Sequence, residues 1–392
     1  MRKNYKLTML SCFGSYLVQA TVINFLPLLF ITFHDSFGIP LQQITLLVTV
    51  NFIVQLAADL VAAIFIDRVG YRVGAVGSQV FCSVGLILLT FLPDLMPTPF
   101  MGIMISVIVY SVGAGLIEAL ISPIVESTPS DNKETAMSLL HSFYCWGHVF
   151  LVVASTAFFA VFGMANWRIL ACIWALVPLA NVFYFMLVPI YPIVAEGEKQ
   201  LPLRELLSKR VFWLLLVMMV CAGASEQAMS QWSSAFAEKA LGVSKAIGDL
   251  AGPCAFAVFM GTARALYGKF AEKIPLKAFM LGSSAMCIGC YLLSSLTGNA
   301  LLGLIGCAAC GFSVGIFWPG TFSIAPGVLP GGGTAMYALM ALCGDLGCSG
   351  GPTLVGFVAG AVGGQLQTGI LAAIIFPVLM LLLTATLKER KA

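Results

Sequence analysis

Long uninterrupted apolar segments are the feature of this sequence that most limits its fold. Each has 20 or more residues, the length that an α-helix needs to cross the ~30 Å hydrocarbon core of a bilayer. Strands of a membrane barrel would alternate apolar and polar residues over about ten positions, and these segments do not. We therefore expect an all-α polytopic membrane protein. Its twelve spans are predicted at 7–33, 41–66, 73–92, 100–126, 135–162, 168–190, 211–238, 247–270, 277–297, 300–325, 333–362 and 366–387.

The composition excludes a water-soluble fold. Hydrophobic residues make up 60% of the 392 positions and charged residues only 9%, against roughly 25% charged in soluble domains. The first segment is too long for the core of a signal peptide, so we expect it to be retained as a span. The protein is expected in a cell membrane, of the bacterial inner-membrane kind.

Lysine and arginine predict the orientation, because they gather in cytoplasmic loops. With a cytoplasmic N-terminus, only Arg168, Lys239 and Lys245 of the 20 basic residues fall outside. Both termini are then cytoplasmic, and no basic residue lies deep in a span, since Arg264 is counted on the cytoplasmic side. The polar segment 191–210 becomes a cytoplasmic linker between two halves of six spans, 1–190 and 211–392.

Two CxxC pairs have the spacing of a zinc site. They are Cys287 with Cys290 and Cys307 with Cys310. Both pairs lie inside apolar helical segments, where cysteine usually packs as a small hydrophobe. We expect core packing and no metal.

The two halves resemble each other locally, and one loop resembles a known family. Residues 135–137 and 334–336 are both Thr-Ala-Met, and Gly113–Gly115 is echoed by Gly311–Gly315. Residues 63–72, AIFIDRVGYR, resemble the signature G-x-x-x-D-[RK]-x-G-[RK]-[RK] of the major facilitator superfamily, with departures at Ala63 and Tyr71. The resemblance implies two pseudo-symmetric bundles of six helices that work by alternating access.

The same resemblance implies a cytoplasmic gate. Asp67, Arg68 and Arg72 would help to hold the two halves together on that side, and we expect Glu126 to pair with Arg68 or Arg72. Residues 113–118 (GAGLIE) through Pro123 look like the fucose-permease branch, in which an acidic residue here is tied to proton coupling and sugar binding. The sequence has Asn24 where that branch has an acidic residue in its first span. It also lacks in its fifth span the Gly-Pro motif of drug–proton antiporters.

Buried ionisable residues point to a coupled carrier, because a charge in hydrocarbon costs ~3 kcal/mol on insertion scales. Asp59, Glu118, Glu226 and Asp345 fall well inside spans. Without a basic residue at similar depth, they must be protonated, bind a cation or face a watered cavity. This pattern favours coupling to protons or sodium, or a cationic substrate, and disfavours a strongly anionic one.

The coupling candidates are Glu118, His148 and Asp345. His148 shares a helical face with Tyr144 and His141, and histidine changes charge near neutral pH. A Glu–His proton relay is one interpretation. The alternative is that both histidines hydrogen-bond to neighbouring helices.

Substrate contacts are expected where amide, carboxyl and aromatic groups meet at the midplane. The seventh span is the most polar one, and the tryptophans could instead face lipid or pack between helices. Asp59, Gln55 and Asn51 line the same cavity or hold helices together. The candidate substrate-binding residues are Asn24, Tyr144, Trp146, Glu226, Gln227, Gln231, Trp232 and Trp318.

These features predict a secondary active transporter of a small neutral polar solute such as a sugar, driven by protons. The alternative is a proton-coupled exporter of cationic or amphipathic compounds. A membrane enzyme using His141 or His148 would have no reason for two six-span halves, and no G-x-x-x-x-G-K-[ST] loop indicates use of ATP. We expect no cofactor apart from a coupling ion (H⁺, or else Na⁺), no nucleic-acid partner, and function as a monomer.

The topology can be tested by labelling. Single cysteines introduced at Lys199 and Thr98 should react with a membrane-impermeant maleimide from opposite sides of the membrane, because three predicted spans separate the two loops. Vesicles of known sidedness provide the measurement, with the unmodified chain as the background control. Reaction of both sites from one side would contradict the twelve-span map.

Overall fold

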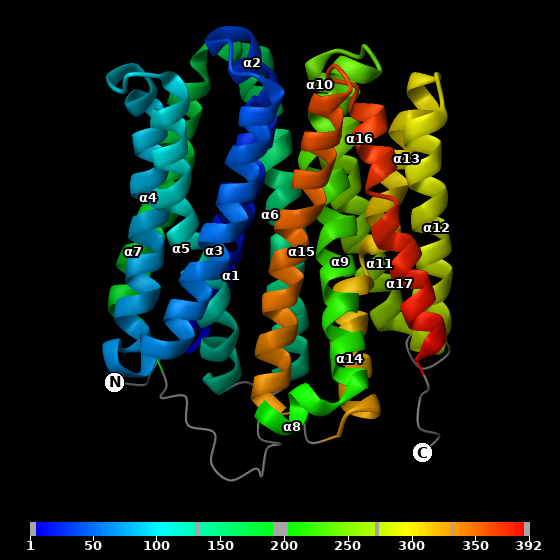
Figure 1. The fold of residues 1–392 in the computed structure, drawn as a ribbon. Helices are drawn as coiled ribbons and strands as arrows, with labels where there is room; N and C mark the ends of the chain where they lie inside the picture. Colours follow the sequence, from blue (N-terminus) through cyan, green and yellow to red (C-terminus); the bar gives the residue numbers. More distant parts are fainter. Residues whose placement is uncertain (1–4, 130–132, 191–202, 271–273, 331–332, 388–392) are drawn as a thin grey trace. The chain divides into compact units, whose positions relative to one another are not determined.

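The chain is helical throughout the part that the structure describes. The computed structural model describes residues 5–129, 133–190, 203–270, 274–330 and 333–387, and no strand occurs among them. The chain divides into two compact units, Met1–Val194 and Ala195–Ala392, and Figure 1 shows long helices in each. The prediction of an all-α polytopic fold is confirmed.

The first unit is built around its first helix, which packs against α5, α6 and α7. Pro27 lies in a 3₁₀ segment that interrupts the first span. The elements of this unit are α1 (Tyr5–Asn24), η1 (Leu26–Leu29), α2 (Phe30–Phe37), α3 (Leu41–Val69), α4 (Tyr71–Leu95), α5 (Pro99–Ser127), α6 (Lys133–Phe162), η2 (Met164–Asn166) and α7 (Trp167–Leu187).

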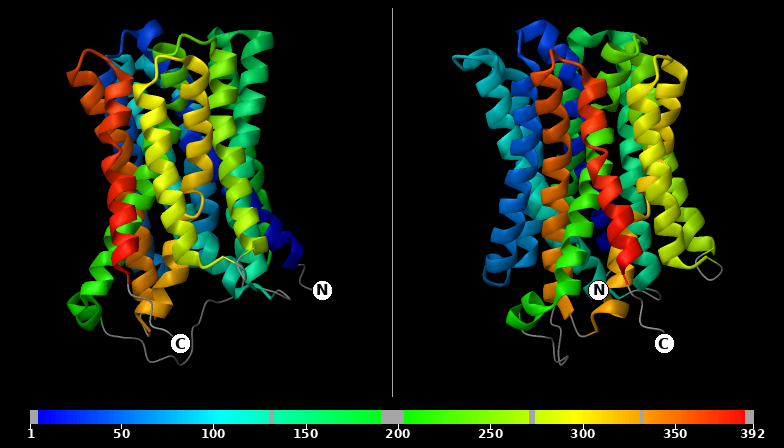
Figure 2. Two further views of the ribbon diagram at one scale, coloured as in Figure 1. Left: turned by 90° about the vertical axis from the view of Figure 1, so that its right-hand side faces the viewer. Right: turned by 45° about the vertical axis from the view of Figure 1, so that its right-hand side comes forward.

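The second unit contains more interrupted spans. Two short π-helical segments, η3 and η4, break the seventh and eighth spans, and π-segments often mark functional positions. The elements are α8 (Leu203–Ser208), α9 (Arg210–Ala235), η3 (Phe236–Ala240), α10 (Lys245–Asp249), η4 (Leu250–Cys254), α11 (Ala255–Phe270), α12 (Leu276–Leu296), α13 (Ala300–Val314), α14 (Phe317–Val328), α15 (Gly333–Ala361), α16 (Leu366–Ala372) and α17 (Ile375–Thr386). Helices α12 and α13 lie side by side in Figure 2.

Eleven helical segments among the described residues are long and apolar enough to cross a membrane. The remaining predicted span, 333–362, corresponds to α15, whose 29 residues also exceed the necessary length. Several glycines, Asp345 and Pro352 lie within this helix. Within the predicted linker, residues 203–208 form the short helix α8.

Local sequence explains where several helices begin and end. Thr98 caps α5 by accepting a hydrogen bond from the Met101 amide at 3.3 Å, with Pro99 as the first helical residue. Asn299 caps α13 in the same way through the Leu302 amide. Gly70 alone separates α3 from α4, with φ of 94°, a conformation that glycine adopts without the strain other residues would meet.

The repeated glycines have the same role in both units. A Cβ on Gly115 would lie 2.3 Å from the Gln55 carbonyl oxygen, so α5 touches the backbone of α3. A Cβ on Gly311 would lie 2.0 Å from the Phe256 carbonyl oxygen, so α13 touches the backbone of α11. Because small residues let membrane helices approach closely, the echoed glycines mark equivalent close packing in each unit.

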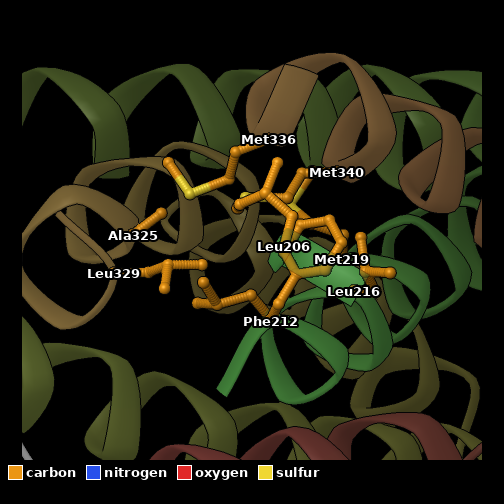
Figure 3. Close-up of a cluster of buried hydrophobic side chains, with 9 residues drawn as sticks. Leu206, Phe212, Leu216, Met219, Ala325, Leu329, Met336 and Met340 are labelled. Carbon is orange, nitrogen blue, oxygen red and sulfur yellow. The ribbon is translucent and has the colours of Figure 1, made fainter. Parts of the chain in front are cut away.

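A buried hydrophobic cluster fixes α8 to the second unit (Figure 3). Leu206 of α8 is fully buried in it, beside Phe212 and Met219 of α9. Trp213 donates from its indole nitrogen to the Leu207 carbonyl at 2.8 Å. The helix within the linker is therefore part of the folded second unit. The cluster comprises Leu206, Phe212, Leu215, Leu216, Met219, Ala325, Leu329, Met336 and Met340.

The close glycine contacts predict that an added methyl group destabilises the protein at some glycines and not at others. Gly311→Ala should destabilise the protein by about 1–3 kcal/mol, because a methyl group at this position meets backbone that cannot rotate away. Gly289→Ala is the matched control, since a Cβ there has nothing within 4 Å. Thermal unfolding of the purified variants measures the difference. Equal midpoints for the two variants would show that the α11–α13 contact is not tight.

Candidate functional site

A chain of polar side chains connects three helices of the first unit. The Gln19 Nε2 donates to Glu118 Oε2 at 3.2 Å and lies 3.3 Å from Gln55 Oε1. Gln55 in turn donates to Asn51 Oδ1 at 3.0 Å, and the Ser111 hydroxyl donates to the same oxygen at 2.6 Å. The structure thus joins Glu118 of α5, Gln19 of α1 and the amides of α3 into one network.

The Gln19 amide leaves one group of this network without a partner. Its Oε1 is buried and has no hydrogen-bond partner among the described residues, and a buried unsatisfied acceptor costs about 1–3 kcal/mol. A 180° rotation of the amide would not remove this cost, because Nε2 would leave Gln55 Oε1 and take the place without a partner. A proton on the carboxyl oxygen of Glu118 that Gln19 does not contact would instead leave the hydrogen bond to Oε2 intact.

A second group of contacts lies between α1 and α6. Asn24 Nδ2 donates to the Tyr144 hydroxyl at 3.3 Å, so two predicted substrate residues meet. The ring of Tyr16 stands edge-on to His141, with centroids 5.3 Å apart, and its hydroxyl lies 3.1 Å from Ser122 Oγ of α5. Hydroxyl, amide and aromatic groups are thereby collected along α1.

His148 is separated from this network. It is 1% exposed, and its Nε2 has no hydrogen-bond partner. The predicted proton relay with Glu118 therefore has no direct hydrogen bond through this atom. His148 remains a candidate only as a buried titratable group on α6.

A carboxylate of the seventh span, Glu226, has a basic partner that the sequence did not predict. Arg264 lies inside α11, and its guanidinium is 3.6 Å from Glu226 Oε2. Its Nε also donates to the Gly315 carbonyl at 3.1 Å. The prediction that no basic side chain accompanies the buried carboxylates is wrong for Glu226, because a long arginine side chain reaches far from its own Cα.

Two glutamines extend from this ion pair along α9. Gln227 Nε2 donates to Glu226 Oε1 at 3.3 Å, and Gln231 Nε2 donates to Gln227 Oε1 at 3.0 Å. All three side chains are buried. The structure therefore brings together three of the predicted substrate residues.

The three candidate tryptophans have different surroundings. Trp232 is fully buried and donates to the Pro352 carbonyl at 2.9 Å, so its ring packs between α9 and α15. Trp318 lies against α15, where a Cβ on Gly344 would come within 2.2 Å of its ring. Trp146 is 53% exposed, in line along α6 with other exposed apolar side chains. Trp232 and Trp318 thus pack against α15, and Trp146 lies two residues from Tyr144 on a different face of α6.

The remaining candidates are only partly described. Asp345 is buried on α15, at 7% exposure. Arg72 is exposed and donates to the Phe185, Met186 and Val188 carbonyls at 2.8 Å, which caps the end of α7. The side chains of Asp67, Arg68 and Glu126 lie outside the described residues. The gate thus remains a prediction.

The cysteine pairs meet within the core of the second unit. Sγ of Cys287 lies 3.9 Å from Sγ of Cys310, and Sγ of Cys307 lies 3.5 Å from the Met229 sulfur. All four CxxC cysteines are buried. Among the described residues, no group of three or more His, Cys, Asp or Glu side chains has a geometry for a metal ion.

The first unit contains network residues that the sequence analysis did not single out. Gln19 and Tyr16 occupy one face of α1 three residues apart, a spacing that could have identified them. Ser111 and Ser122 of α5 carried no such signal. The pairing of Arg264 had no comparable signal, because it depends on which helices pack together.

Comparisons with known proteins identify the fold. A model of the Major Facilitator Superfamily matches residues 8–352. A bacterial homologue of the human lysosomal transporter Spinster, inward-facing and unoccupied, superposes with a TM-score of 0.75 at 14% identity over 98% of each chain. The E. coli fucose:proton symporter superposes with a TM-score of 0.64 at 16% identity over 97% of each chain. Identities this low show the fold alone, and no curated protein matches the chain.

Substitution of Trp232 distinguishes a structural role of this residue from a role in substrate binding. Trp232→Phe should lower the free energy of unfolding by about 1–3 kcal/mol, because the indole N–H to Pro352 is lost in a fully buried place. Trp146→Phe is the matched control and should change it by less than about 0.5 kcal/mol. Unfolding midpoints of the purified variants measure both. A Trp232→Phe protein as stable as the control would contradict a structural role.

Proposed function

Because the chain belongs to the Major Facilitator Superfamily, we propose that it moves a small neutral polar solute, sugar-like in chemistry, together with protons. Membership makes the protein an integral membrane transporter and not an enzyme. The superfamily fold is also that of the fucose:proton symporter. A hydroxyl-rich solute and proton coupling are the parts that we add.

The hydrogen bond between Gln19 and Glu118 carries the proposal. Glu118 is half-buried in α5 and is contacted here by a neutral amide. A carboxylate in such a place is costly while ionised, and a proton relieves that cost. The Gln19 amide can pair with either form of Glu118, because Oε2 accepts from Nε2 whether or not the other carboxyl oxygen carries a proton. Residues that exchange protons in a transport cycle need this property.

The charges of the second unit support a neutral solute. Arg264 is a largely buried cation, but Glu226 lies beside it and cancels its charge. A solute bound near this pair meets no net charge, and the amide of Gln231 suits hydroxyl groups. In the first unit, the amide of Asn24 and the hydroxyl of Tyr144 have the same chemistry. We retain Gln227 as a further contact and propose that Trp232 and Trp318 support helices near the substrate.

One observation favours the second candidate, an exporter of cationic or amphipathic compounds. Asp59 is half-buried on α3, and it forms no hydrogen bond or ion pair with the described residues. A cationic substrate would supply the missing charge. Counterflow with neutral monosaccharides against a panel of cationic dyes distinguishes the two candidates.

Other roles complete the proposal. Alternating access would expose Glu118 to each solution in turn, with the loop residues Asp67, Arg68, Arg72 and Glu126 as the cytoplasmic gate. His148 and Asp345 are the further coupling candidates, and Na⁺ is the alternative ion. We propose that the chain works as a monomer without a cofactor.

Glu118→Gln tests the coupling. The variant should lose uphill accumulation of solute under an imposed proton gradient, because glutamine keeps the shape but cannot bind a proton. Exchange between preloaded vesicles and medium should persist, since exchange needs no net proton movement. Proteoliposomes with radiolabelled L-fucose, the solute of a protein with this fold, and a panel of other monosaccharides provide the measurement.

The control is Glu205→Gln on α8, a glutamate whose ion pair with Lys209 is exposed. It should leave accumulation unchanged. Accumulation by Glu118→Gln at the wild-type level would show that the proton is carried elsewhere, with His148 and Asp345 as the next residues to replace.

A further inference from the structure

The polar side chains of α9 form a hydrogen-bond relay with one direction. Gln231 donates to Gln227, Gln227 donates to Glu226, and Arg264 approaches the other carboxylate oxygen of Glu226. Every step directs a positive or N–H group toward Glu226. We refer to these four residues as the α9 relay.

The chemistry of the end group dictates this direction. An ionised carboxylate can only accept hydrogen bonds, so Gln227 must face Glu226 with its NH₂ group. The Gln227 oxygen then faces the next turn of the helix, where Gln231 must present its own NH₂ group. The orientation of both amides therefore follows from the charge on Glu226. It does not depend on telling the amide nitrogen from the amide oxygen by shape, which is difficult.

Arg264 is the residue that holds this charge in place. Its side chain is 18% exposed and that of Glu226 is 11% exposed, so the pair is largely withdrawn from water. Its Nε also bonds to the carbonyl of Gly315, the residue at which α13 ends before α14 begins. A cation at the C-terminal end of a helix is favourable. One guanidinium thus joins α11, the carboxylate of α9 and the break between α13 and α14.

We infer that Arg264 is a positioning residue that acts through Glu226 and Gln227 to fix the hydrogen-bonding direction of Gln231. The inference rests on the proposed function, which assigns Gln231 to the substrate. With one N–H of Gln231 directed to Gln227, the amide oxygen of Gln231 is turned away from the relay. Arg264 thereby decides which polar group of Gln231 a solute would meet, and Glu226 is the anchor of the relay and not itself a substrate contact.

The first unit provides a comparison within the same chain. There Glu118 also ends a chain of amides, through Gln19 and Gln55, but the Gln19 oxygen is left without a partner. The α9 relay has an arginine at its end and all of its links satisfied in one direction, so it is built to keep its direction.

A stability cycle tests the relay without any ligand. Gln231→Glu places a carboxylate oxygen against the Gln227 oxygen, which cannot turn away while Glu226 is ionised. The substitution should lower the unfolding temperature by roughly 5 °C or more in the wild-type background. In the Glu226→Gln background it should cost roughly 2 °C or less, because Gln227 is then free to rotate and donate to position 231.

Gln227→Leu supplies the control for direct charge repulsion between positions 226 and 231. Leucine removes the link, so Gln231→Glu should then lower the unfolding temperature equally with Glu226 and with Glu226→Gln. A difference between the two backgrounds that persists with leucine would overturn the proposal. So would equal costs in the two backgrounds when Gln227 is present. If Gln231→Glu does not fold in the wild-type background, its recovery by Glu226→Gln counts as the expected coupling, and failure in both backgrounds counts against it.

A binding arm tests the effect on substrate, with L-fucose as the probe. The double variant Glu226→Gln/Arg264→Gln should fold but bind L-fucose roughly tenfold more weakly, equivalent to about 1.4 kcal/mol, while Arg264→Lys retains binding. Asp94→Asn/Arg168→Gln removes an exposed ion pair and is the matched control. Unchanged binding by the first double variant overturns the positioning role. If the wild-type protein binds no monosaccharide, the proposed substrate class fails, and the stability cycle still judges the relay.

Discussion

A membrane offers no water to a buried polar group, and the rest of this structure depends on that constraint. Backbone N–H and carbonyl groups must therefore find partners inside the protein, and most buried side-chain groups do so as well. Serine and threonine side chains accordingly donate to the carbonyl one turn earlier, as Ser15 and Thr321 do, and Tyr291 donates to the Ser225 carbonyl. The glycines of α5 and α13 let backbones touch, so that the helices need few polar side chains to hold them together.

The same constraint makes the polar networks informative. Each unit contains a carboxylate with two amides in sequence, and each resolves the charge differently. In the second unit an arginine supplies the opposite charge, which fixes the direction of the amides. In the first unit a neutral amide, Gln19 Nε2, contacts Glu118, and the oxygen of that amide is buried without a hydrogen-bond partner among the described residues. A network with a fixed direction suits recognition of a substrate, and a carboxyl group beside a neutral amide suits coupling to protons.

The candidate residues show how much of a site the pattern of polar residues in a sequence can identify. The pairing of Asn24 with Tyr144 and the grouping of Glu226, Gln227 and Gln231 follow residues that the sequence had already selected by polarity in an apolar span. The tryptophans could not be sorted in this way, because an aromatic ring fits lipid, helix contacts and ligands equally well. Only the packing separates the fully buried Trp232 from the largely exposed Trp146.

The sequence by itself determined that the chain is a bundle of membrane helices, and its loop signature indicated the superfamily. Those conclusions are local, since the length and apolarity of a segment decide whether it can cross a bilayer. The tertiary structure decided which charges meet. Arg264 follows Glu226 by 38 positions in the chain, and the two side chains meet only because α11 packs against α13, which in turn packs against α9. Whether a buried carboxylate is compensated or must take up a proton therefore depends on contacts between helices that no segment encodes alone.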